Sequence, residues 1–192
     1  MVRKAERPQH IIDQTLNAAA ASGWARLTLR DIAVASEMSL ADLHAVYPSK
    51  HEILAAYLRS VDATVLAGEV PEDENPRDRL FDVLMQRFDA LNANRTAVVN
   101  ILVAQAYGPL SALALVPQML CSMSLMLEIA NIKTTGIVGA LRVKGLAAVW
   151  LATLRAWRHD ESPDMAATMA ALDRNLGHAE RVARRLPHRA AA

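Results

Sequence analysis

The side chains with the greatest potential for chemistry in this chain are its histidines, its single cysteine and a set of hydroxyl groups. The sequence contains no nucleophile elbow, no glycine-rich phosphate loop and no HExxH motif. The histidines are scattered, without cysteine or acidic partners at the spacing of metal ligands. We therefore predict that the chain is not an enzyme and takes no metal or cofactor. The histidines are His10, His44, His51, His159, His178 and His188.

The hydroxyl residues Thr28, Ser39 and Ser49 stand where helices are expected to begin. Thr28 and Ser49 are each followed three residues later by an acidic residue, which is the spacing of a capping box. Apolar residues recur at helical spacing after each hydroxyl. Pro48 ends the second helix, because a proline disfavours the α conformation in the residue before it. Residues 28–54 therefore predict two short helices joined by a tight turn, and the start of a longer helix.

The sequence LTLRDIAVASEMS followed by LADLHAVYPSKHEIL resembles the DNA-binding domain of tetracycline-repressor-type transcriptional regulators. The resemblance covers about residues 9–57, and TLRDIA and YPSK are its most specific parts. It implies an all-α fold, with an N-terminal three-helix helix-turn-helix module (1–57) and a C-terminal helical domain for ligand binding and dimerisation (58–192). It also implies double-stranded operator DNA as a partner, with the second short helix in the major groove.

The family's DNA contacts fall on seven positions of this chain. The resemblance implies phosphate contacts by Thr28, His44 and Lys50. It implies contacts to base edges by a second group, which consists of Ser39, Leu40, Ala41 and Asp42.

Three features depart from the family pattern. Glu37 stands in the turn where the family usually has glycine, and a glutamate in a left-handed turn costs roughly 1 kcal/mol. His44 stands where the family usually has tyrosine. No arginine or lysine lies between Asp31 and Ser49, and the Asp42 carboxylate would face a phosphate-rich groove.

Composition favours helix throughout the chain. Of its 192 residues 53% are hydrophobic and only 4% aromatic, and alanine, leucine and methionine carry the apolar content. A net charge of +1 gives the whole chain no strong attraction to nucleic acid. The single cysteine, Cys121, rules out an internal disulfide, fits a reducing, cytoplasmic compartment, and is expected to be buried among apolar neighbours. The N-terminus lacks the apolar run of a signal peptide.

Charged segments flank the N-terminal module. Arg3, Lys4 and Arg7 form a basic arm, which is either a solvated terminus or an arm that contacts DNA phosphates. An acidic segment with two prolines, at 69–76, is expected to be a solvated link to the remaining chain.

No charged residue occurs between Thr96 and Leu127. The part from Pro109 onward is long enough for a membrane span, but Pro117 and three serines favour a helix buried among other helices. Such a methionine- and leucine-rich helix is also what an apolar cavity needs. We predict a site for a hydrophobic small molecule or lipid lined by Phe88, Leu102, Met119, Met123, Met126 and Trp150.

The last predicted helix restarts at Ser162, as N-cap, and carries an apolar stripe with heptad-like steps. With the long apolar helix expected at 137–158, this stripe predicts a four-helix interface in a homodimer. The arginines around it would suit anionic lipid, but one surface cannot serve a dimer and a membrane at once. The stripe consists of Met165, Met169, Leu172, Leu176, Ala179, Ala183 and Leu186.

The segment WRHDESPDMAATMAALDRNLGHAERVA is similar to the end of the lipid-binding accessory proteins of coenzyme Q biosynthesis. That family has the same repressor-like fold, holds lipid in a hydrophobic cavity and meets membranes through its last helix. The leading hypothesis is a ligand-responsive regulator in which DNA and ligand binding are reciprocally coupled. The alternative is a lipid-binding protein of ubiquinone biosynthesis that does not bind DNA and makes peripheral membrane contact. A third option is a helical protein that only interacts with partners.

Overall fold

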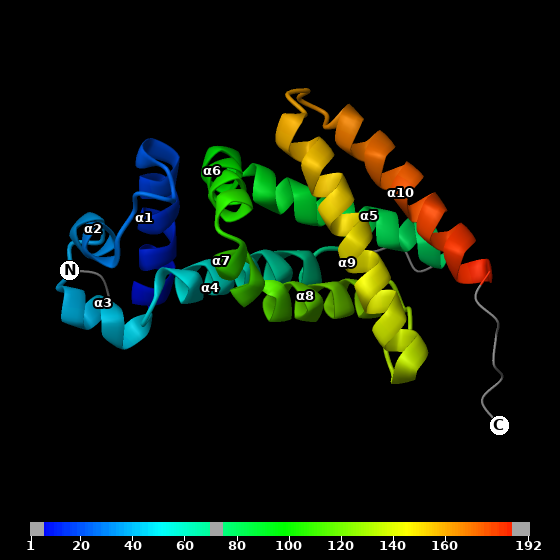
Figure 1. Cartoon of the computed structure of the whole chain (residues 1–192), viewed down its shortest axis with the longest axis horizontal. Helices are drawn as coiled ribbons and strands as arrows, with labels where there is room; N and C mark the ends of the chain where they lie inside the picture. The colour runs from blue at the N-terminus through cyan, green and yellow to red at the C-terminus, as the bar shows by residue number, and fades with distance from the viewer. Residues whose placement is uncertain (1–5, 70–74, 186–192) are drawn as a thin grey trace. The chain divides into compact units, whose positions relative to one another are not determined.

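The computed structural model describes residues 6–69 and 75–185, and every regular element in these ranges is a helix (Figure 1). The predicted all-α fold is therefore confirmed. Most of the basic arm and of the acidic link lies outside the described residues. The helices are α1 (Arg7–Ser22), α2 (Leu29–Ala35), α3 (Leu40–Val46), α4 (Lys50–Leu66), α5 (Pro76–Asn92), α6 (Arg95–Tyr107), α7 (Pro109–Ala114), α8 (Val116–Ile129), α9 (Gly136–His159) and α10 (Ala166–Arg185).

Local sequence signals explain where the first four helices begin and end. α1 ends at Gly23, whose φ of 83° lies in the left-handed region that glycine adopts without strain. The side chains of Thr28, Ser39 and Ser49 each accept a hydrogen bond from the backbone N–H three residues later, as predicted. α3 ends at Val46, before the proline.

The chain divides into two compact units. The first consists of the first 67 residues together with Asp89–Gln118, and the second consists of Gly68–Phe88 together with the chain from Met119 onward. α4 continues without a break through Tyr57 to Leu66. The division after residue 57 thus falls inside a helix, and as the limit of a DNA-binding module it stays a prediction.

In the first unit, α1 packs against α2, α4 and α6. Ile11 and Ile32 are completely buried in this core, and so is Leu43 on α3. The Asn100 side chain on α6 donates to the carbonyl oxygen of Ala19 at 3.0 Å, near the C-terminal end of α1. The short helices α2 and α3 are therefore held by burial against longer helices, because helices of this length are not stable alone.

In the second unit, α9 and α10 lie side by side (Figure 1). An aromatic cluster fills its core: the Phe88 ring stacks on Trp150 with centroids 4.5 Å apart and lies 6.2 Å from the Trp157 ring. Met123 and Met126 on α8 are completely buried. Stacked aromatic rings contribute stability beyond the area they bury.

The part of the charge-free run from Pro109 to Leu127 is not the single buried helix that the sequence predicted. It breaks at Leu115 into α7 and α8, and Leu113 is 63% exposed. Cys121 is exposed, which corrects the prediction that it is buried. Residues two positions apart point to nearly opposite sides of a helix, so Cys121 faces outward where Met123 faces the core. Among the described residues, one helix, α9, is long and apolar enough to cross a membrane, judged by length and composition alone.

The apolar stripe of the last helix is placed differently from the prediction. Met165, Leu172 and Leu176 are at most 6% exposed, and α10 packs along α9 of the same chain. These three residues therefore form a seam within the chain. Met169 and Ala179 are half-buried and Ala183 is exposed, so a dimer contact by the rest of the stripe stays a prediction. Leu186 lies outside the described residues.

The link between α9 and α10 is organised by a buried carboxylate. α10 begins at Ala166, later than predicted, although the Ser162 hydroxyl still accepts a hydrogen bond from the Ala166 N–H at 3.1 Å. The Asp160 Oδ2 atom accepts hydrogen bonds from the N–H and the hydroxyl of Thr168, both at 2.7 Å, and its Oδ1 atom accepts from Ser162. Burial alone would raise the pKa of Asp160, but these hydrogen bonds outweigh it and hold the pKa far below its usual range.

Candidate nucleic-acid interface

The first short helix is fixed at its start by a reciprocal capping box. The N–H of Asp31 donates to Thr28 Oγ1 at 3.2 Å, while the Thr28 N–H and hydroxyl donate to Asp31 Oδ2 at 2.9 and 2.7 Å. The hydrogen bonds from the Thr28 side chain, and then its backbone, lower the pKa of Asp31. The Thr28 hydroxyl, predicted to contact phosphate, thus directs its proton to Asp31 at the N-terminus of α2.

The turn between α2 and α3 has the geometry of a Schellman motif. The N–H of Met38 donates to the carbonyl of Ala33 at 3.0 Å, and that of Glu37 donates to Val34 at 3.1 Å. Glu37 has a φ of 54°, so the left-handed turn is kept although a glutamate occupies it. The His10 Nε2 atom on α1 lies 3.3 Å from the Ser36 carbonyl oxygen, which ties this turn to the longer helix.

α3 presents one exposed face and one buried anchor. Leu43 is completely buried, whereas all four residues predicted to contact base edges are exposed. The Ser39 hydroxyl donates to Asp42 Oδ2 at 2.6 Å and accepts from the Asp42 N–H at 3.0 Å. His44 is exposed on the same short helix. The structure therefore brings Ser39, Leu40, Ala41, Asp42 and His44 together on one solvent-facing surface.

Lys50 is placed differently from the other predicted contacts. Its Nζ atom donates to the carbonyl oxygens of Trp24 and Leu27 at 2.9 and 2.8 Å and lies 4.9 Å from the centroid of the Trp24 ring. Burial lowers the pKa of Lys50, while two carbonyl dipoles and the ring face favour its charged form. This cation binds the α1–α2 connection to the start of α4, and its phosphate contact stays a prediction.

Sequence reasoning missed two cations in this region. Arg26, in the connection before α2, and Arg30, in the first turn of α2, are both exposed. Neither side chain makes a hydrogen bond or ion pair with another residue that the structure describes. Their position on either side of Thr28 was the available signal, because a helix N-terminus flanked by cations favours anions.

The residues predicted to line a ligand site are distributed over both units, and the ligand site stays a prediction. Phe88, Met123, Met126 and Trp150 lie in the second unit with at most 5% of their surface exposed. Met119 is half-buried on α8, and Leu102 is half-buried on α6 in the first unit. Arg87, which the sequence reasoning also missed, is 2% exposed, with its guanidinium 5.1 Å from the centroid of the Trp150 ring.

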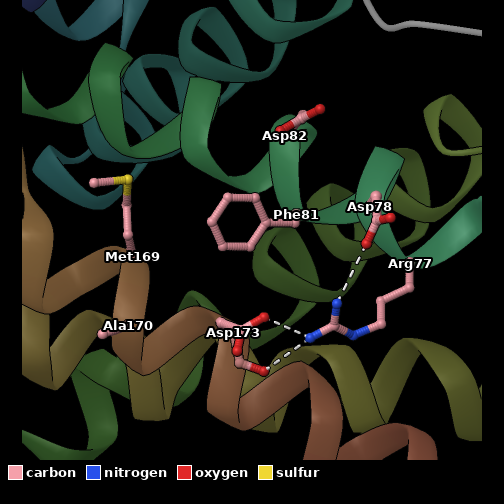
Figure 2. Close-up of a pocket in the computed structure, with 7 residues that line it drawn as sticks. All are labelled: Arg77, Asp78, Phe81, Asp82, Met169, Ala170 and Asp173. Atoms are coloured by element: carbon pink, nitrogen blue, oxygen red, sulfur yellow. Dashed lines mark hydrogen bonds and ion pairs between the residues drawn. The ribbon is translucent and has the colours of Figure 1, made fainter. Parts of the chain in front are cut away.

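A separate groove of about 550 Å³ lies in the second unit between α5 and α10. Figure 2 shows the Arg77 guanidinium between two carboxylates, 2.6 Å from Asp173 and 3.3 Å from Asp78. The hydrogen bond that Arg77 donates to Asp173 is the main reason that the pKa of Arg77 is raised. Its lining contains none of the predicted ligand residues, and consists of Arg77, Asp78, Phe81, Asp82, Met169, Ala170 and Asp173.

Known proteins share this arrangement of helices. The chain is 27% identical over 165 residues to the HTH-type transcriptional repressor KstR of Rhodococcus jostii, covering 84% of this chain and 78% of that protein. A TetR transcriptional regulator from Nitrosomonas europaea superposes with a TM-score of 0.72 at 21% identity, covering 91% of this chain and 98% of the other. The chain has the fold of tetracycline-repressor-type transcriptional regulators. No protein-family model matches it.

Two further structures of TetR-type regulators resemble this one. One from Rhodococcus sp. RHA1 gives a TM-score of 0.64 at 15% identity and covers 91% of this chain and 97% of its own. Thermus thermophilus FadR, a repressor solved in complex with lauroyl-CoA, gives 0.59 at 16% identity and covers 96% and 98%. The curated relative is a transcriptional repressor, and this similarity does not favour the ubiquinone-pathway alternative.

Proposed function

We propose that this regulator binds operator DNA as a homodimer, with the α3 helices of the two copies in major-groove segments about one DNA turn apart. The supporting observation is the exposed face of α3, on which the predicted base-contacting residues lie together. Leu43 anchors this helix from the other side, and the capping hydrogen bond of Ser39 fixes its start. The helix is thus rigid while its outer face contributes nothing to the core.

Phosphate contacts in this proposal come from cations beside the helix ends. Arg26 and Arg30 are exposed on either side of Thr28, at the N-terminus of α2, where backbone N–H groups also favour an anion. Thr28 and His44 keep their proposed phosphate contacts. Lys50 supports the same surface from behind by holding the connection that carries Arg26.

The DNA proposal is tested by titrating a labelled random-sequence duplex, and a duplex selected from that pool, at about 50 and about 200 mM salt. Arg30→Ala should weaken binding to every sequence and flatten the salt dependence by about one ion per protomer. Arg174→Ala removes an equally exposed arginine from α10 and should change neither value. Failure of the wild-type protein to bind any duplex at about 50 mM salt contradicts the proposal.

The proposed dimer uses the outer face of α9 in place of the buried stripe of α10. Ile137, Leu141 and Leu151 are 83%, 52% and 47% exposed, and exposed Ala148 lies between the two leucines. Apart from Lys144 and Arg155, which are exposed on the same side of α9, this face is apolar and carries a small residue, so a second helix can approach it closely. Sedimentation at micromolar concentration should show a dimer, which Leu141→Arg dissociates. Leu66→Arg, on an exposed site of α4, should leave it intact, and a wild-type monomer would refute the proposal.

The proposed effector is an apolar molecule that enters the second unit around Phe88, Met123, Met126 and Trp150, with the predicted Met119 as a further contact. Methionine side chains repack readily, so a filled core of this kind can open around a ligand. The similarity to a repressor solved with lauroyl-CoA suggests a first probe. Lauroyl-CoA should raise the melting temperature and weaken DNA binding, since the two affinities are reciprocally coupled. Free coenzyme A is the control, and equal effects of both compounds would argue against an apolar site.

A further inference from the structure

The exposed face of α3 is apolar to an unusual degree for a DNA-reading surface. Leu40 is 42% exposed, and Ala41 and Ala45 are both exposed. Residues four apart lie one above the other on a helix, so Ala41 and Ala45 form one row, and Leu40 and His44 form the neighbouring row. We call Leu40, Ala41 and Ala45 the apolar face of α3. The alanine row has no side chain long enough to keep the helix backbone away from a groove floor.

The polar chemistry of the same face is limited. Bidentate reading of guanine needs arginine or lysine, and bidentate reading of adenine needs asparagine or glutamine. None of these residues occurs from Ser39 to Val46. The Ser39 hydroxyl and one oxygen of Asp42 are already hydrogen-bonded to each other. Of the groups that base pairs present in the major groove, the thymine 5-methyl is the one that an apolar side chain contacts.

We propose, on the basis of the operator binding proposed above, that the apolar face of α3 reads thymine methyl groups, so that the operator half-site is recognised through methyl contacts to A·T pairs. Each methyl group removed from water at the interface is worth about a fourfold gain in affinity. Two such contacts in a half-site give about fifteenfold. Because Leu40 is the longest of the three side chains, it reaches the outermost methyl, and the alanines contact those beneath the helix axis.

The test uses the full-length protein and a duplex operator selected from a random pool. Each thymine of the selected half-site is replaced singly by 2′-deoxyuridine, which pairs in the same way but lacks the 5-methyl group. We expect about fourfold weaker binding at two or more positions. Deoxyuridine outside the half-site should have no effect. Equal affinity for thymine and deoxyuridine at every position overturns the inference while leaving operator binding in place.

A matched pair of variants tests whether Leu40 is the side chain that contacts a thymine methyl group. Leu40→Ala should bind the thymine operator about fourfold more weakly or worse and should lose its sensitivity to deoxyuridine at one position. Leu66→Ala makes the same change at a 60% exposed site on α4 and should keep the full sensitivity. Thermal melting shows whether both variants are folded. If Leu40→Ala keeps the wild-type sensitivity at every position, the apolar face does not read these methyl groups, and if no duplex is selected at all, operator binding fails with it.

Discussion

Replacing Lys50 separates a structural role from a phosphate-binding role. The Nζ atom donates to two carbonyl oxygens, at 2.9 Å to Trp24 and 2.8 Å to Leu27, and lies over the Trp24 ring. Lys50→Ala removes both hydrogen bonds and the cation–π contact. Hydrogen bonds to a charged group are worth about 1.5–3 kcal/mol each when buried, and less here because the side chain is only half-buried. We therefore expect a loss of about 2 kcal/mol in the free energy of unfolding.

Urea denaturation followed by circular dichroism measures this loss. Lys50→Met keeps an apolar stem over Trp24 but cannot donate, so it should recover only part of the stability. Lys133→Ala, at an exposed lysine in the connection before α9, should be neutral. The salt dependence of DNA binding by folded Lys50→Ala should stay within about half an ion of the wild type. The structural role is refuted if Lys50→Ala keeps the wild-type stability and its DNA affinity depends less on salt, by about one ion per protomer. Such a result would show that Nζ faces phosphate.

Three further outcomes are expected. Glu37→Gly should raise the free energy of unfolding by about 0.5–1 kcal/mol in urea denaturation, because Glu37 has a φ of 54°, and Glu37→Ala should not. Asp160→Asn should lower it by about 2–3 kcal/mol at pH 7. Because the folded pKa of Asp160 is depressed, its stabilisation is present above the unfolded pKa of about 4 and disappears as pH falls further, so acid titration should bring the two proteins together. Exposed Cys121 should react with a thiol reagent in the native protein, whereas protection until unfolding would place it in an interface.

The sequence predicted those features of the fold that depend on neighbouring residues. Capping by Thr28, Ser39 and Ser49 needs only a hydroxyl and the backbone three residues on, and the structure has all three caps. The end of α1 at Gly23 follows from its freedom at positive φ. The exposed face of α3 follows in the same way, since a seven-residue helix with one buried leucine turns its other side chains to solvent.

Features of the structure that depend on contacts between distant residues could not be predicted from the sequence. The stripe on α10 has the same period whether it packs on a second copy or on α9, and only the fold shows that Leu172 is used within the chain. Lys50 has a phosphate-binding position in the family pattern, but the carbonyls that hold it lie 23 and 26 residues earlier. Asp160 accepts hydrogen bonds from Thr168, which is eight residues away and beyond the range of a cap motif.

Because few cations lie near α3, the proposed regulator depends on binding two DNA half-sites at once. With Lys50 turned inward, the cations proposed to contact phosphate are Arg26 and Arg30, and each methyl contact proposed for the apolar face of α3 is weak. One half-site then binds too weakly to compete with bulk DNA, because phosphate neutralisation supplies most of the non-specific affinity. Joining two half-sites makes the second contact intramolecular and can raise affinity by factors of about 10²–10⁴. Operator binding should therefore fail in Leu141→Arg although α3 is unchanged, and an effector need only alter the joining of the two copies to release DNA.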